Sequence, residues 1–156
     1  MNQKLTTADP LAVIAAARRW FGTPYLHQAS TQGAGADCLG LARGVWRALH
    51  GAEPFVIPPY TRDWGEAGGR ETLAEAAAMF LIDVPLAEAG PGCLVLFRMA
   101  PHAPAKHCGI LWTRDGAPTF IHAYEGAGVV EHDLSPFWAR KIRRAFAYPA
   151  PHPGEV

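Results

Sequence analysis

Apolar residues recur at helical spacing in three segments of the first half of the chain. The first, LAVIAAARRWF, follows an aspartate–proline pair at Asp9 and ends at Gly22. A polar cap, an early proline and a terminal glycine are typical helix boundaries. The second starts at Cys38 in CLGLARGVWRAL, and the third is RETLAEAAAMFLI, residues 70–82. The pattern therefore predicts three N-terminal helices.

Two segments between these helices lack the periodicity. Residues 23–36 are rich in glycine, serine and threonine, which predicts a loop. Residues 52–69 combine prolines and glycines with aromatic side chains, which predicts an ordered surface excursion rather than a flexible linker.

After Pro91 the pattern changes to short β-type runs separated by turn residues. The runs are GCLVLFRM, HCGILWT, TFIHAY, VVEHDL and, near the end, RAFAY, with a short helical turn expected in FWARKI. Helices followed by strands are typical of an α+β domain, with the helices packed on an antiparallel sheet. We expect one domain over residues 1–150 and a frayed, proline-rich tail over 151–156.

An Asp-Gly pair predicts a hairpin between HCGILWT and TFIHAY. With Thr113 opposite Pro118, His122 lies opposite Gly109, two residues from His107. Opposed residues share a sheet face, and alternate residues along a strand return to it. His107 and His122 are therefore expected on one face as diagonal neighbours, within reach of each other's rings. A three-residue loop would separate them, so the prediction depends on the turn.

Cys38 is the first residue of a predicted helix, directly after a glycine-rich stretch and Asp37. Unpaired backbone N–H groups and the helix dipole at this position favour thiolate over thiol. The same N–H groups can stabilise an oxyanion. Taken alone, Cys38 fits a small buried apolar residue better than a nucleophile. With a base and an orienting partner in His107 and His122, catalysis becomes the favoured interpretation.

A zinc site made from Cys38, His107, Cys108 and His122 is the alternative, but strand alternation points Cys108 away from His107. Cys93 and Cys108 are interpreted as buried small residues. The remaining histidines lack a comparable arrangement and are expected in surface or loop positions: His27, His50, His102, His132 and His152.

Composition narrows the function classes further. The formal net charge is zero, which argues against a nucleic-acid partner bound through its phosphates. No apolar run approaches the roughly 18 residues that a membrane span needs, so no membrane insertion is expected. Three widely spaced cysteines indicate a reducing compartment, and the N-terminus is a poor secretory signal. Synthesis in the cytoplasm without a signal peptide is the expectation.

Taken together, these segments resemble the NlpC family of cell-wall peptidases, which have a papain-like fold, and more closely its branch in tailed phages and gene transfer agents. The matching pieces run in order along nearly the whole chain: GTPYLHQAS, ADCLGLARGVW, PPYTRDW, PGCLVLFRM, AKHCGIL, FIHAYEGAGVVE and AFAYP.

The resemblance implies a role for five residues. Cys38 would be the nucleophile, His107 the base and His122 its orienting partner, in agreement with the hairpin geometry. Tyr25 would lie near the oxyanion and substrate. Asp37 would either bind a free substrate amine or cap the helix, two roles that the sequence leaves open.

The sequence departs from the family at two places. Leu39 replaces the serine that often follows the cysteine, and LHQASTQGAGA replaces the usual Trp-Gly-Gly loop after the tyrosine. Both departures bear on substrate contacts, and neither touches the three catalytic positions.

The family activity that this implies is a cysteine endopeptidase acting on peptidoglycan stem peptides, at the bond between γ-D-glutamate and diaminopimelate. It would need no metal or cofactor. Tail-tip or hub proteins of a phage-like particle would be its partners, and the particle would deliver it to the target cell envelope. Two alternatives stay open, namely a non-catalytic binding module of a tail tip and a thiol amidase or acyltransferase.

Overall fold

The computed structural model describes residues 6–62 and 69–152. Its helices are α1 (Pro10–Arg18), α2 (Cys38–His50), α3 (Thr72–Phe80), the 3-10 helix η2 (Leu86–Glu88) and α4 (Pro136–Ala139). Its strands are β1 (Ser30–Thr31), β2 (Gly35–Ala36), β3 (Ile82–Val84), β4 (Leu94–Arg98), β5 (Ala105–Arg114), β6 (Ala117–Tyr124), β7 (Gly128–Asp133) and β8 (Ile142–Ala147). Within the described part, no helix is both long and apolar enough to cross a membrane.

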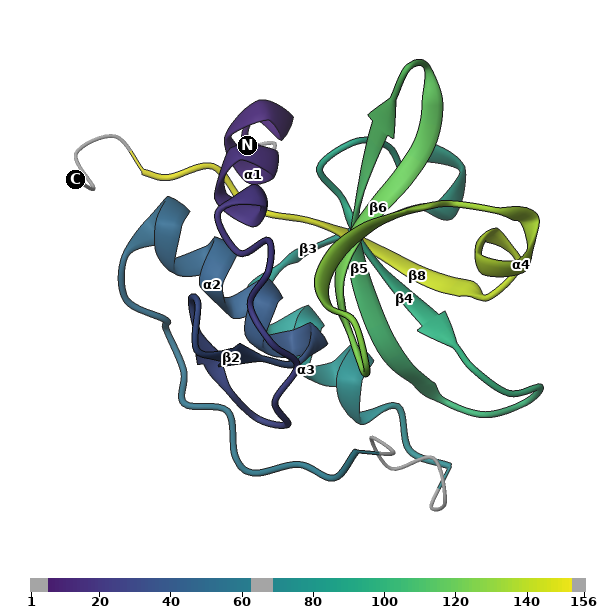
Figure 1. Ribbon diagram of the computed structural model, residues 1–156, viewed down its shortest axis with the longest axis horizontal. Coiled ribbons are helices and arrows are strands. Elements are labelled where there is room, and N and C mark those ends of the chain that lie inside the picture. The colour runs from purple at the N-terminus through teal and green to yellow at the C-terminus, as the bar shows by residue number, and fades with distance from the viewer. Residues whose placement is uncertain (1–5, 63–68, 153–156) are drawn as a thin grey trace, which may run out of the picture.

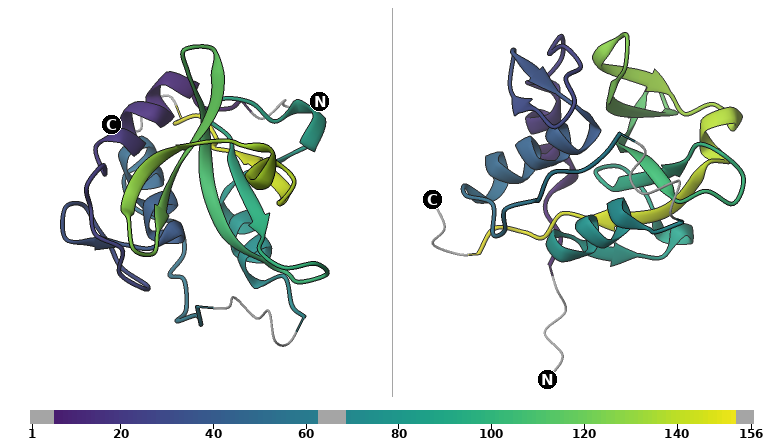
Figure 2. Two further views of the ribbon diagram at one scale, coloured as in Figure 1. Left: turned by 45° about the vertical axis from the view of Figure 1, so that its right-hand side comes forward. Right: turned by 90° about the horizontal axis from the view of Figure 1, so that it is seen from below.

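Six strands form one twisted antiparallel sheet in the order β3-β8-β4-β5-β6-β7. Helices α1 and α2 lie together on one side of it, and the short α4 lies on the other, as Figures 1 and 2 show. The predicted α+β architecture, with N-terminal helices packed on an antiparallel sheet, is confirmed.

Apolar side chains cover both faces of this sheet. On β4, Leu94 and Leu96 point into a cluster shared with α1, α2 and α3. The alternate residues Val95 and Phe97 point into a second cluster, beside Trp138 of α4. Burial on both faces explains why this strand is a continuous apolar run rather than an alternating one.

The hairpin between β5 and β6 has the predicted register. Asp115 and Gly116 have φ values of 52° and 79°, which are typical of a two-residue turn that requires left-handed backbone. The pairing places Thr113 opposite Pro118 and Ile110 opposite Ile121, so parity along the two strands is as expected.

Other boundaries differ from the prediction. Helix α1 ends at Arg18, before Gly22, and the expected loop 23–36 contains the small ribbon β1–β2. The third helix ends at Phe80, because the residues that follow form β3 and pair with β8. Part of the expected excursion 52–69 and most of the expected frayed tail, residues 63–68 and 153–156, lie outside the described residues.

Candidate active site

Cys38 is the first residue of α2, and Asp37 caps the helix. Asp37 Oδ1 accepts a hydrogen bond from the Gly40 backbone N–H at 2.7 Å. Cys38 therefore lies where the backbone N–H groups have no partner inside the helix. The residue is 6% exposed and belongs to the apolar cluster shared with the helices.

Two side chains lower the pKa of the Cys38 thiol. The larger effect is a hydrogen bond from the Cys108 thiol; burial opposes it, and a hydrogen bond from His107 adds to it. The net pKa lies well below that of an ordinary thiol. The pKa of Cys108 is raised, because its proton is engaged by Cys38 and because it is buried. Cys38 is thus the thiolate of the pair, and Cys108 is its donor.

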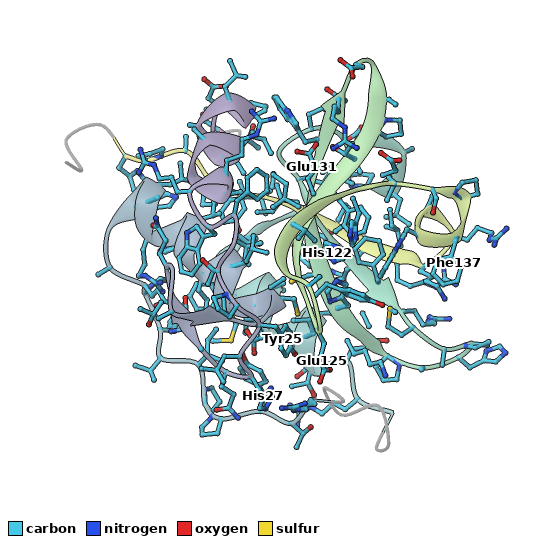
Figure 3. The ribbon with its side chains drawn as sticks, viewed as in Figure 1. Tyr25, His27, His122, Glu125, Glu131 and Phe137 are labelled. Atoms are coloured by element: carbon cyan, nitrogen blue, oxygen red, sulfur yellow. The ribbon has the colours of Figure 1, made fainter. Side chains whose placement is uncertain are left out.

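His107 and His122 lie together as the hairpin register predicted. His107 Nε2 is 2.7 Å from His122 Nδ1, and the ring planes are 71° apart. Since Nε2 of His107 is engaged by His122, Nδ1 is the nitrogen left for the sulfur. His122 is fully buried, in the middle of the sheet in Figure 3. Burial, together with the neighbouring His107 and His132, lowers the pKa of His122 to about 2, so this ring is neutral.

His132 belongs to the same cluster, and the prediction that it is an isolated surface or loop residue is wrong. Its Nδ1 lies 2.9 Å from His122 Nε2. On β7, His132 is opposite Phe120, and Phe120 is two residues from His122 on β6. The turn around Gly126 joins β6 to β7, and strand alternation on these two strands places His132 on the face of His122, so the sequence pattern contains this signal.

Asp37 lies at the centre of a second set of hydrogen bonds. Its Oδ2 accepts from the Gln28 backbone N–H at 2.7 Å and from the Tyr60 hydroxyl. His27 Nδ1 lies 3.9 Å from the same oxygen, so His27 also has a place near the site. The structure therefore shows the capping role of Asp37, while binding of a substrate amine stays a prediction. Tyr60 was not anticipated from the sequence.

Tyr25 lies with His107 along a cavity of about 310 Å³. Burial is the main cause that raises the pKa of Tyr25 to about 12, so its hydroxyl keeps its proton and can donate a hydrogen bond. Arg62 and Glu125 form an exposed ion pair at 3.1 Å on this cavity. Glu125 lies close to Tyr25 in Figure 3. The other lining residues are Met99, Lys106, Ala123 and Tyr124.

The remaining cysteines and the zinc alternative can be placed on this geometry. All three cysteines are free thiols. Cys108 is buried, as expected, whereas Cys93 is only partly buried. Across residues 6–62 and 69–152, no three or more His, Cys, Asp or Glu side chains are grouped so that they could coordinate a metal ion. The arrangement instead fits thiol chemistry, with a nucleophile, a base and an orienting ring.

Solved structures with a similar fold have a low sequence identity to this chain. A Staphylococcus aureus protein, described as similar to a lipoprotein of the NLP/P60 family, matches with a TM-score of 0.62 at 19% identity, over 96% of this chain and 45% of its own. A Bacillus cereus NlpC/P60 family protein matches with a TM-score of 0.63 at 20% sequence identity, over 94% of this chain and 42% of its own. The NlpC/p60 domain of the peptidoglycan hydrolase SagA matches with a TM-score of 0.59 at 24% sequence identity, over 90% of this chain and 99% of that domain. The fold is that of NlpC/P60 proteins.

This likeness confirms the predicted NlpC-type fold. The chain spans less than half the length of the first two proteins. No protein-family model and no curated protein sequence matches it.

Proposed function

We propose that this protein is a cysteine endopeptidase that hydrolyses peptidoglycan stem peptides. The observation that carries the proposal is the grouping of Cys38, His107 and His122: His107 helps to lower the pKa of the Cys38 thiol, and its Nε2 lies 2.7 Å from His122 Nδ1. Its fold is shared with a domain described as part of a peptidoglycan hydrolase. Together these features supply a nucleophile, a base and a scaffold suited to the reaction.

The chemistry follows from the positions of the side chains. The Cys38 thiolate attacks the carbonyl carbon of the scissile amide, and the backbone N–H groups at the start of α2 stabilise the oxyanion. The Tyr25 hydroxyl, which stays protonated, is a further hydrogen-bond donor, and it lies on the cavity that His107 also lines. Protonated His107 then gives its proton to the leaving amine. Water, deprotonated by His107, hydrolyses the thioester and releases the thiol.

We place the scissile bond between the γ-carboxyl of D-glutamate and diaminopimelate. The residues flanking this bond carry free carboxylates, and Arg62 and Lys106 bring positive charge to the cavity beside His107. Glu125 offsets part of that charge by pairing with Arg62. The cavity therefore suits an anionic peptide of this kind.

For the biological setting we propose the tail of a phage-like particle or gene transfer agent, with tail-tip or hub proteins as partners. The sequence segments that resemble the phage branch of the NlpC family support this setting. Local wall cleavage at the target cell envelope would open a path for DNA.

Replacement of the nucleophile tests the activity. We expect Cys38→Ala to abolish the release of new amino groups from purified peptidoglycan, whereas Cys93→Ala, a free thiol away from His107, keeps it. Mass spectrometry of the products identifies the bond and separates an endopeptidase from an amidase or acyltransferase. Wall hydrolysis by Cys38→Ala at the wild-type rate would refute the assignment. Binding of wall peptides without turnover by the wild type would instead indicate a binding module.

A further inference from the structure

His132 on β7 extends the pair of imidazoles to a row of three. His107 Nε2 lies 2.7 Å from His122 Nδ1, and His122 Nε2 lies 2.9 Å from His132 Nδ1. Both distances are those of N–H···N hydrogen bonds. His122 is fully buried, whereas His132 is partly exposed on the edge strand of the sheet. The row therefore runs from β5 across one face of the sheet to its edge at β7.

The hydrogen bonds to His107 and His132 restrict His122 to one of two tautomers. A neutral imidazole has one N–H and one acceptor nitrogen, and burial keeps His122 neutral by lowering its pKa to about 2. If His122 accepts at Nδ1, it carries its hydrogen on Nε2 and must donate to His132. If it donates at Nδ1, it must accept from His132 instead.

Only the first tautomer of His122, which accepts at Nδ1, is compatible with a Cys38 thiolate beside a protonated His107. Protonated His107 carries hydrogen on both ring nitrogens, so its Nε2–H needs an acceptor at His122 Nδ1. His122 must then carry hydrogen on Nε2, buried among aromatic rings, where an unpaired donor is costly. His132 Nδ1 is the acceptor within reach of it. With the second tautomer, His107 and His122 would present N–H groups to each other.

Among residues 6–62 and 69–152, the other groups near His132 do not offer this acceptor. The rings that face it besides His122 are those of Phe120 and Tyr124, at centroid distances of 6.3 and 6.2 Å. The two neighbouring carboxylates are engaged elsewhere, because Glu131 accepts from Thr119 and Asp133 pairs with Arg114. Strand alternation places both of them on the face opposite His132.

We propose that His132 is a positioning residue for the Cys38–His107 pair: its Nδ1 accepts the Nε2–H of His122 and so selects the tautomer of His122 that stabilises protonated His107. The inference rests on the proposed function and adds a fourth residue to its machinery. His132 touches neither the sulfur nor the substrate cavity, and it acts through His122 alone.

Two substitutions at this position separate hydrogen bonding from packing. His132→Leu removes the acceptor, whereas His132→Asn can place its Oδ1 near the position of Nδ1. We expect iodoacetamide to alkylate Cys38 about tenfold more slowly in His132→Leu at pH values where the thiolate is only partly formed, since a buried donor loses its partner and the rate profile is displaced to higher pH. His132→Asn is expected to recover most of the lost rate. A wild-type profile in His132→Leu, or an Asn variant no better than the Leu variant, would overturn the proposal.

A measurement on the unmodified protein covers the case in which His132→Leu does not fold. Nitrogen-15 NMR of the imidazole rings should show His122 protonated at Nε2 and bare at Nδ1, with His132 bare at Nδ1. Hydrogen on Nδ1 of His122 would contradict the inference. Neither measurement uses peptidoglycan, so fast alkylation without wall hydrolysis would count against the proposed function alone.

Discussion

At the scale of single residues, the two buried cysteines of the site differ in which of them keeps its proton. Cys38 begins α2, and Cys108 lies on β5 one residue after His107. Strand alternation correctly placed Cys108 on the face away from His107. That face is the one on which α2 packs, so the Cys108 thiol meets the Cys38 sulfur. A residue interpreted from its pattern as a buried small side chain is thereby the main cause of the lowered pKa of Cys38.

Loss of the Cys108 donor should raise the pKa of Cys38. In Cys108→Ala the thiolate loses a hydrogen bond, and bonds to charged groups contribute about 1.5–3 kcal/mol. We therefore expect about tenfold slower alkylation of Cys38 at pH values where its thiolate is only partly formed, with the profile displaced to higher pH. Cys108→Ser keeps a donor of similar size and should stay close to the wild type. The pH dependence of alkylation measures both, and identical profiles for the Ala variant and the wild type would contradict the role of Cys108.

At the scale of elements, the first turn of α2 is fixed against the ribbon β1–β2 and the chain before it. The Asp37 backbone N–H donates to Ala29 O at 3.3 Å, and the Ser30 hydroxyl donates to Gly40 O at 2.6 Å. A Cβ atom at Gly40 would lie 1.9 Å from Ala29 O. Only glycine permits this contact, so the segment before α2 fixes the position of Cys38.

Substitution at Gly40 tests that contact. Alanine favours a helix over glycine by about 1 kcal/mol, but a backbone clash at this distance forces a shift that costs about 1–3 kcal/mol or more. We expect Gly40→Ala to lower the free energy of unfolding and to slow alkylation of Cys38, because the ribbon and the helix must separate. Gly90→Ala, where a Cβ meets nothing within 4 Å, is the matched control. Denaturant titration of both variants decides, and an unchanged midpoint for Gly40→Ala would count against the clash.

The elements also show where sequence patterns succeed and where they stop. The β5–β6 register followed from one Asp-Gly turn, and it brought His107 and His122 together correctly. Strand β3 was not predicted: it begins at Ile82, the last residue of the predicted third helix, and its partner β8 is distant in the sequence. The contact between Cys108 and Cys38, like the bond from Tyr60 to Asp37, depends on how separate elements dock. Local periodicity does not encode such docking.

At the scale of the whole molecule, the sheet separates two apolar clusters that meet the site from different sides. Cys38 and Cys108 belong to the cluster under the helices. The rings of His107 and His122 contact Phe97, Phe120 and Trp138 of the other cluster. The sulfur and the imidazoles come together beside β5, next to the cavity that carries Lys106 and Arg62.

The charge of that cavity predicts a preference among substrates. Lys106 is only partly buried, so we expect Lys106→Gln to lower kcat/KM for stem peptides with free carboxylates by about two- to fivefold, in the range of an exposed charge pair. A stem peptide with amidated carboxyl groups serves as the control and should lose little. Steady-state kinetics on the two peptides gives the comparison. Equal losses on both would show that Lys106 does not sense the charge of the substrate.

The three imidazoles come from one uninterrupted meander, β5 to β7, whereas the sulfur is supplied by a helix far earlier in the chain. Neighbouring strands find each other sooner than distant segments do. During folding, the three imidazoles would thus come together first, while the Cys38 thiol still had the low reactivity of a free cysteine. The thiol would become a strong nucleophile only when α2 docks. Until then, other electrophiles would react with it slowly.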